Sequence, residues 1–384
     1  SPPLPGLGVW FLLVAPVLGG LVYGPLVQRF APEARGHGVP EVMLAVARRG
    51  GRIPATVAAV KALASGICIG TGGSVGREGP IVQIGSALGS AIGQWLRVPA
   101  TRLVLMVACG AAGGISATFD APISGVVFGL ELILRSFSAE AFGVLVISSV
   151  VANVVAEVIA GDRAILTLPH FDLGSPAQLP LYALLGLLAG LLGWAFARIL
   201  YAVEDACDAV WRGPEWLRPA VGGLLLGGLL LALPQMYGVG YPVLEAAIGG
   251  RYVVGFLLLL VVGKILASSL TIGIGGSGGV FAPSLFVGGT AGTAFGYAAA
   301  ALFPALDLHP GAFGLVGMAA VFAGAAHAPI TAVLIVFELT GDYALILPLM
   351  AAVVLATGLS NLVSRDNIYT LKLLRRGIDL AAAT

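Results

Sequence analysis

Charged residues are scarce in this sequence. Asp, Glu, Lys and Arg make up only 10% of its 384 residues, whereas they make up roughly 25% of a typical soluble domain. Hydrophobic residues account for 58%, and the mean hydropathy is +1.00. So few charges cannot cover a globular surface in water, which excludes a soluble protein. We therefore expect a multi-pass protein of the cell membrane, with membrane lipid as a partner.

Cysteine and runs of basic residues are also scarce. Cys68, Cys109 and Cys207 lie in apolar surroundings, without CxxC or Cys/His spacing. We expect buried, inert thiols and no disulfide framework, metal site or cofactor. The net charge is +1 and no long basic run occurs, so nothing indicates nucleic-acid binding. No cleavable signal peptide is visible, and the leading SPPLPG is interpreted as a truncated or added end.

Long uninterrupted apolar runs are fewer than the hydropathy suggests. Several stretches are shorter than the roughly 20 residues that a spanning helix needs, and 56 Gly and 23 Pro interrupt them. Broken helices are tolerated at membrane depth only where the backbone lines a cavity or is buried in protein, which favours an all-α transport protein. The expected helices are 7–27, 55–70, 81–95, 101–118, 123–134, 141–160, 179–203, 219–233, 252–272, 284–303, 311–325, 328–340 and 344–363.

The chain repeats itself. Residues 61–93 align without a gap on residues 264–296, with 15 identities in 33 positions. A second match pairs FDAPISGVVFGLEL (119–132) with AHAPITAVLIVFEL (326–339). Two matches in the same order, at offsets of 203 and 207, predict two structurally related halves. The halves are expected at 1–204 and 221–384, with a connecting region at 205–220 and a cytoplasmic C-terminal end.

Each half leads a glycine run into a proline and then into an apolar helix. Such breaks at corresponding positions of two halves are the best sequence pointer to a transport site near the membrane midplane. Proline near the first turn marks a helix start, where free N–H groups and the helix dipole attract an anion. Two converging helix starts therefore predict an anion site that needs no lysine or arginine. RGHGVPEVM (35–43) is a third start of the same kind.

Three segments carry a resemblance to a known family. GHGVPE (36–41), GREGP (76–80) and GGVFAP (278–283) resemble the GSGIPE, GREGP and GxFxP sequences of the CLC family of chloride channels and transporters, in the same order. IYTLKLLRRG near the end is similar to the segment that supplies that family's anion-binding tyrosine. The resemblance covers about 7–378. It implies an all-α CLC-type inverted repeat with broken, partly spanning helices, a homodimer, and an absent first helix.

Glu78 is a carboxylate within a glycine-rich run, in a sequence with few charged residues. By resemblance it is the gating glutamate, which competes with the anion. A carboxylate at a helix N-terminus is stabilised as an anion and so imitates the substrate, and ionisable groups inside a membrane are functional by default. A simple loop ion pair of Glu78 with Arg77 is the alternative. We expect Arg77 to hold neighbouring backbone carbonyls.

The resemblance implies further residues around the anion. Backbone N–H groups of Val280 and Phe281 would line the central site, and Phe281 takes in the second half the place of Glu78 in the first. Tyr369 would direct its hydroxyl at the anion; the alternative is an interfacial tyrosine. The predicted anion-binding set is His37, Gly38, Gly79, Val280, Phe281 and Tyr369.

His37 departs from the family, which usually has serine there. Imidazole can donate a hydrogen bond, and as imidazolium it adds charge. His37 would then make anion binding depend on pH, or shift selectivity towards bicarbonate. In the alternative, the ring turns away and backbone N–H groups bind the ion alone. Fluoride is a further alternative anion.

A second departure concerns protons. Exchangers of the family usually carry two adjacent glutamates after the Ala-Pro turn, whereas here Glu131 is followed by Leu132. Leucine cannot relay a proton, so we expect a channel-like or weakly proton-coupled chloride transporter; an anion/proton antiporter is the alternative. Glu131 is a possible proton-pathway residue, although we expect Glu131 and Glu338 to bond to helix ends.

Other charged residues have structural interpretations. Lys61 and Lys264 occupy equivalent repeat positions, and we expect their side chains to reach the membrane interface. The basic cluster near the end is expected on the cytoplasmic side and consists of Arg365, Lys372, Arg375 and Arg376.

Other classes fit less well. An intramembrane protease needs a Ser/His or paired Asp arrangement, but Ser74 and Ser277 lie in repeated glycine turns without a matched base. A cation transporter needs carboxylates at the midplane, and a sensor has no use for two broken helices. We therefore expect a protein that is not an enzyme and moves chloride or another small anion.

Overall fold

The protein is almost entirely helical. The structure is a computed structural model that describes residues 8–161, 166, 169–171, 174–341 and 343–380, and no β-strand occurs among them. The helices up to the middle of the chain are α1 (Phe11–Phe30), α2 (Val39–Arg48), α3 (Thr56–Gly70), α4 (Glu78–Trp95), α5 (Ala100–Phe119), α6 (Pro122–Phe128), a π-helical segment (Gly129–Leu134), α7 (Ala139–Ala160) and α8 (Leu179–Val210).

The remaining helices follow a short loop after α8. They are α9 (Arg218–Ala232), α10 (Tyr241–Ile248), α11 (Val254–Gly273), α12 (Phe281–Leu302), α13 (Pro310–Ala326), α14 (Pro329–Thr340), α15 (Ile346–Val363) and α16 (Thr370–Leu374). All the predicted apolar stretches are confirmed as helices. The short helix α10 was not predicted.

Long and short apolar helices are mixed, as the sequence predicts. In the described part of the chain, seven helices are long and apolar enough to cross a membrane: α1, α5, α7, α8, α11, α12 and α15. Helix α13 is shorter, and every residue from Gly311 to Ala326 is buried. Protein rather than lipid therefore surrounds this short helix, which is the condition under which short helices are stable at membrane depth.

The two sequence matches are repeated in the helix boundaries. Helices α3 and α11 end at equivalent glycines, and α4 and α12 begin at equivalent residues. Asp120 and His327 both take the left-handed conformation, with φ of 53° and 52°, where α5 and α13 end. Equivalent turns therefore lead into α6 and α14. The proposed division at 204 stays a prediction; α8 continues past it to Val210 and α9 begins at Arg218.

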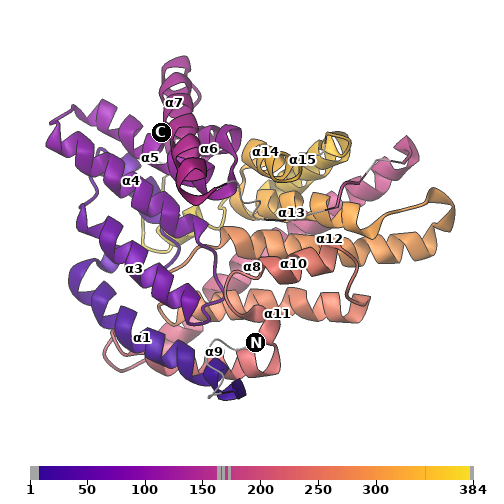
Figure 1. The fold of residues 1–384 in the computed structure, drawn as a ribbon, viewed down its shortest axis with the longest axis horizontal. Helices are drawn as coiled ribbons and strands as arrows, with labels where there is room; N and C mark the ends of the chain where they lie inside the picture. The colour runs from indigo at the N-terminus through magenta and orange to yellow at the C-terminus, as the bar shows by residue number, and fades with distance from the viewer. Residues whose placement is uncertain (1–7, 162–165, 167–168, 172–173, 342, 381–384) are drawn as a thin grey trace.

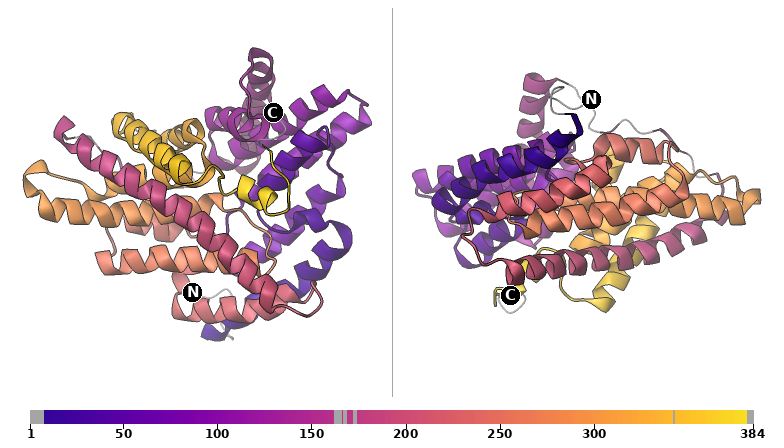
Figure 2. Two further views of the ribbon diagram at one scale, coloured as in Figure 1. Left: turned by 180° about the vertical axis from the view of Figure 1, so that it is seen from behind. Right: turned by 90° about the horizontal axis from the view of Figure 1, so that it is seen from below.

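The halves lie side by side. Helices α3, α4 and α5 lie to the left in Figure 1 and α11 to α15 to the right, while α1 and α9 lie together along the lower edge. The long α8 crosses the back, and α16 lies where the halves meet (Figure 2). Helix α1 packs on α9, α4 on α12, and α6 on α14. The N-terminal ends of α4 and α12 are thereby brought together near the middle.

Glycines allow the paired helices to approach closely. A Cβ on Gly85 of α4 would lie 2.1 Å from the carbonyl oxygen of Gly110 in α5. The equivalent Gly288 of α12 would meet the carbonyl oxygen of Gly317 in α13 at 2.2 Å. Small residues drive helix packing in membranes because they bring backbones together. Both repeats therefore require glycine at the same contact.

The thiols are less buried than expected. All three cysteines are free. Cys68 is buried, as predicted, whereas Cys109 of α5 and Cys207 of α8 are half-buried. Within the described ranges, no group of three or more His, Cys, Asp or Glu side chains is placed to hold a metal ion.

Candidate functional site

Backbone hydrogen bonds join the three glycine-rich loops that the sequence singled out. Gly76 and Gly279 exchange N–H···O bonds of 2.8 and 2.6 Å. Gly36 donates to Gly276 at 3.1 Å and accepts from Gly278 at 3.2 Å. Since these residues directly precede α2, α4 and α12, the three helix N-termini meet at one place. The predicted convergence is present.

No Cβ fits at the centre of this junction. A Cβ on Gly79 would lie 2.2 Å from the carbonyl oxygen of His37 and 2.9 Å from the Cα of Gly279. Gly38 has φ of 81°, a conformation that favours glycine, and it is the N-cap of α2. Glycine therefore lets three backbones pack where their N–H groups can face one small ion.

Glu78 is buried at this junction as the first residue of α4, with 1% of its surface exposed. Its Oε1 accepts a hydrogen bond of 2.5 Å from the hydroxyl of Tyr241. Its Oε2 is buried without a hydrogen-bond partner among the described residues, on the side of Ala282 in the first turn of α12. The carboxylate thus lies between the positive ends of two helices, where a free anion would also be stabilised.

Tyr241 is a site residue that the sequence analysis missed. It begins α10, and the sequence around it, GVGYP (238–242), matches GHGVP (36–40) at an offset of 202. This short match lies before the longer alignment and shares only two glycines and the proline. The helices confirm it, because Gly38 and Gly240 are both N-caps with positive φ, of 81° and 95°.

The expectation for Arg77 is wrong. Its side chain is exposed, and none of the described hydrogen bonds runs from it to a backbone carbonyl. The guanidinium instead lies 6.0 Å from the ring centre of Tyr241. The carbonyls of Gly76 and Gly279 beside it are instead bonded by each other's N–H groups. It also forms no ion pair with Glu78 among the described contacts.

The other predicted anion-binding residues lie around the same junction. Val280 is the N-cap of α12 and Phe281 its first residue. The Phe281 ring packs against Phe322 and Phe119, at centroid distances of 4.2 and 5.2 Å, so its backbone N–H rather than its side chain is free to face an ion. Tyr369 is 1% exposed and precedes α16.

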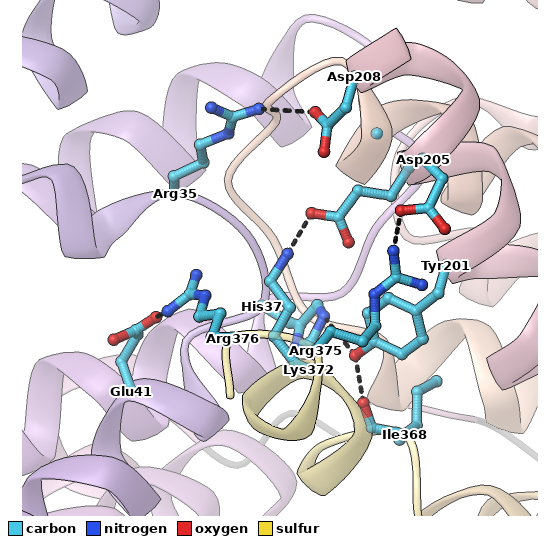
Figure 3. Close-up of polar contacts among 12 residues, drawn as sticks. Arg35, His37, Glu41, Tyr201, Asp205, Asp208, Ile368, Lys372, Arg375 and Arg376 are labelled. Atoms are coloured by element: carbon cyan, nitrogen blue, oxygen red, sulfur yellow. Dashed lines mark hydrogen bonds and ion pairs between the residues drawn. The ribbon is translucent and has the colours of Figure 1, made fainter. Parts of the chain in front are cut away.

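His37 turns its ring into the protein. It is 2% exposed, and its ring lies between those of Tyr201 and Tyr369, with centroids 6.2 and 6.4 Å away. Its Nε2 is 3.3 Å from the hydroxyl of Tyr201, which donates to the carbonyl of Ile368, the residue before Tyr369 (Figure 3). Tyr201 of α8 therefore positions two predicted anion-binding residues, and the sequence gave no indication of it.

The expectation for Lys61 and Lys264 is wrong. Both side chains are fully buried instead of reaching the membrane interface. Lys61 Nζ donates to the carbonyls of Ala34 and Gly36, at 2.9 and 2.7 Å. Lys264 Nζ donates to the equivalent loop in the second half, at Gly238 (3.0 Å) and Val239 (2.9 Å). Each lysine holds the loop before α2 or α10. The ammonium group is bonded to the carbonyls of that loop instead of extending to the membrane interface.

Glu131 and Glu338 bond to helix ends, as predicted. Glu131 accepts from the backbone N–H of Ile330 (3.1 Å) and Thr331 (2.8 Å), at the start of α14. Glu338 accepts from Ile123 and Ser124 at the start of α6, the N–H bonds being 2.9 and 2.7 Å. The two halves therefore cap each other's helices. Leu132 beside them is buried.

The basic residues near the C-terminus are paired. Arg375 contacts Asp205, Arg376 contacts Glu41, and Lys372 contacts Glu204 (Figure 3). These ion pairs fasten α16 and the two residues after it to α2 and α8, in the part of the chain that follows Tyr369. The cytoplasmic location of this cluster stays a prediction.

Comparisons with known proteins agree with this architecture. The family model described as "Voltage gated chloride channel" matches residues 19–361. The chain is 37% identical to the "H(+)/Cl(-) exchange transporter ClcA" of Vibrio parahaemolyticus, over 95% of this chain and 79% of the relative. It is 39% identical to ClcA of Vibrio cholerae, over 90% and 75% of the two chains.

Solved structures have the same fold. A slow cyanobacterial Cl-/H+ antiporter superposes with a TM-score of 0.86 and 28% identity, covering 99% of this chain and 89% of that one. A CLC-type fluoride/proton antiporter superposes with a TM-score of 0.79 and 25% identity, over 94% and 88%. The chain therefore belongs to the voltage gated chloride channel family, and it is a multi-pass membrane protein of anion transport.

Proposed function

We propose that this protein exchanges an anion, chloride in the first place, for protons. The two Vibrio relatives and the cyanobacterial antiporter are described as chloride/proton exchangers, and they favour this function over the channel-like one that Leu132 suggested. The observation that carries the proposal is the buried Glu78 carboxylate between the N-termini of α4 and α12. One group there can both exclude an anion and carry a proton.

The charge of Glu78 determines which ion occupies the junction. The ionised carboxylate fills the place that an anion would take and satisfies the same helix dipoles. The protonated carboxyl has no such attraction and leaves the place to the anion. Because the two occupants exclude each other, anion entry is linked to protonation of Glu78. This linkage is what an exchanger requires.

The anion would be held mainly by backbone donors. We propose that the N–H groups at Gly38, Gly79, Val280 and Phe281 and the Tyr369 hydroxyl surround it, with His37 beside it. Phe281 has no charge to compete with the anion, in contrast to Glu78 at the equivalent position.

The inner proton route cannot use position 132, because Leu132 is buried and apolar. Glu131 is also a poor relay, since its carboxylate already accepts from two N–H groups and the Thr331 hydroxyl. We propose that protons reach Glu78 by another path, and that Glu131 has a structural role.

The protein is proposed to be a homodimer in the membrane. Only 11% of the most apolar 18-residue stretch of helix α7 is buried inside the protein. Its apolar surface must therefore face lipid or a second copy of the chain. Cross-linking in proteoliposomes distinguishes these: a dimer band that persists on dilution into excess lipid supports the dimer, and monomer alone contradicts it.

Flux measurements test the proposed function. Proteoliposomes with an outward chloride gradient should take up protons against their gradient as chloride leaves. Glu78→Gln should abolish proton movement, whereas Glu140→Gln, which changes an exposed carboxylate in α7, should leave it intact. Chloride efflux without protons in the unmodified protein would instead establish a channel. Fluoride and bicarbonate gradients in the same assay test the anion.

A further inference from the structure

His37, in the loop that leads into the junction, has a ring nitrogen without a partner among the described residues. Only 2% of the surface of His37 is exposed. Its Nδ1 is buried and has no hydrogen-bond partner in the described part of the chain. Buried polar atoms are nearly always satisfied, so an orphan at a predicted binding site indicates a missing ligand. Nδ1 is the ring nitrogen nearer the main chain, and His37 immediately precedes the N-cap of α2.

Tyr201 determines which nitrogen carries the hydrogen. A tyrosine hydroxyl has one hydrogen, and that of Tyr201 is donated to the carbonyl of Ile368. Its oxygen can then only accept from His37, at 3.3 Å from Nε2. In the neutral ring, Nε2 therefore carries the hydrogen and Nδ1 presents a lone pair. A lone pair repels an anion, whereas a protonated Nδ1 donates to it.

The charges around the ring are almost all positive. The charged groups that act on His37 are Lys372 of α16, Lys61 of α3 and Arg376, two residues after α16. Each of them already has a partner: Lys372 is bonded to Glu204, Arg376 to Glu41, and Lys61 to backbone carbonyls.

The groups of the remaining elements do not supply a counter-charge. The facing tyrosines are Tyr201 of α8 and Tyr369 before α16, and none of the described hydrogen bonds or ion pairs joins a carboxylate to the ring. Glu78 of α4 is bonded to Tyr241 through Oε1 and keeps a buried Oε2 without a partner among the described residues, but it is not among the charged groups that act on His37. A buried imidazolium without a counter-ion is costly. An anion in the junction would supply that counter-ion.

We propose that His37 takes up a proton on Nδ1 when an anion binds beside it, and releases that proton when the anion leaves. This inference rests on the proposed location of the anion, and it adds a second proton-linked residue to Glu78. The step is a simple transfer: a proton moves from water to Nδ1, and the new N–H donates to the anion. Anion affinity must then rise as the pH falls.

Proton uptake on anion binding is the direct test. Chloride is added to weakly buffered Glu78→Gln protein in detergent, so that Glu78 contributes no titration. We expect up to one proton taken up per chloride bound, and a chloride affinity that rises by about tenfold per pH unit over the range where one linked proton is gained. Adding His37→Ser should remove both effects, because a serine hydroxyl donates without titrating.

Three further variants separate the role of His37 from folding. His37→Gln fills more of the ring's volume than serine and should give the same loss of proton uptake. Tyr201→Phe removes the hydroxyl that accepts the Nε2 hydrogen of His37. It should weaken the pH dependence of chloride affinity without removing it. His309→Gln, which changes an exposed histidine, is the control and should leave proton uptake unchanged.

Two outcomes would overturn this inference alone: chloride binding without proton uptake in Glu78→Gln, or unchanged uptake after His37→Ser. Absence of chloride binding at every pH would overturn the proposed anion site as well. Coupled exchange in proteoliposomes is measured separately, so that an exchanger with pH-independent chloride affinity refutes the role of His37 and leaves the proposed function intact.

Discussion

The two halves have the same backbone at the junction but different side chains. Helices α4 and α12 begin at equivalent residues, yet one begins with Glu78 and the other with Phe281. In the loops before α2 and α10, His37 corresponds to Val239, and at the first residues of these helices Val39 corresponds to Tyr241. Positions that face the proposed anion site differ between halves. This shows that the repeat supplies the geometry while the chemistry is divided unequally.

Positions that hold the framework are the same in both halves. Lys61 and Lys264 each bind the carbonyls of a loop about 25 residues earlier. Glu131 and Glu338 each cap a helix of the other half. The comparison therefore predicts that framework variants act alike in the two halves, whereas site variants act in one half only.

Removing the buried lysines should have the largest effect. Lys61→Met and Lys264→Met each leave two buried carbonyls without their donor, which we expect to destabilise the fold by about 3 kcal/mol in either half. Thermal unfolding in detergent measures this. Arg102→Met, at an exposed position, is the control and should stay within about 0.5 kcal/mol. A loss confined to one half would break the proposed equivalence.

Removing the capping carboxylates should have a smaller effect. Glu131→Gln and Glu338→Gln each replace a charged acceptor at a helix N-terminus by a neutral amide, which should cost about 2 kcal/mol in unfolding free energy. The number of protons exchanged per chloride should not change in either variant. If only Glu131→Gln alters that number, Glu131 is a proton relay and the halves are not equivalent here.

Removing the Tyr241 hydroxyl should have the smallest effect, and only on the site. Tyr241→Phe deletes the hydrogen bond to the Glu78 carboxylate, so the carboxylate competes less well and chloride affinity should rise by roughly tenfold. Isothermal titration with chloride measures it. Tyr343→Phe, which changes an exposed tyrosine, should have no effect. An unchanged chloride affinity in Tyr241→Phe would show that this hydrogen bond does not stabilise the Glu78 carboxylate in the anion site.

Much of the architecture could be predicted from the sequence because it depends on local patterns. The apolar stretches predicted the helices, and the repeated Gly–Pro breaks predicted that the N-termini of α4 and α12 converge. The glutamates after each Ala-Pro turn were correctly assigned to helix ends. In each case the residue type and its repeat partner limit the alternatives.

Other features depend on packing that no local pattern reveals. A lysine on an apolar helix usually extends to the interface; only the folded structure shows that the loops before α2 and α10 present carbonyls to Lys61 and Lys264. Tyr201 lies in the middle of a long apolar helix and contacts residues 164 and 167 positions away. Tyr241 was detectable in GVGYP, but three identities at a slightly different offset are a weak signal.

The exchange of caps between α6 and α14 has a consequence for biosynthesis. The start of α6 is completed by Glu338, which lies 214 residues after Ser124 in the chain. At ribosomal rates of roughly 5–20 residues per second, α6 waits roughly 10–40 s in the membrane for its partner to be translated. During that interval its open N–H groups are available to chaperones or to a neighbouring nascent chain. Severed halves would therefore have to be produced together to mature.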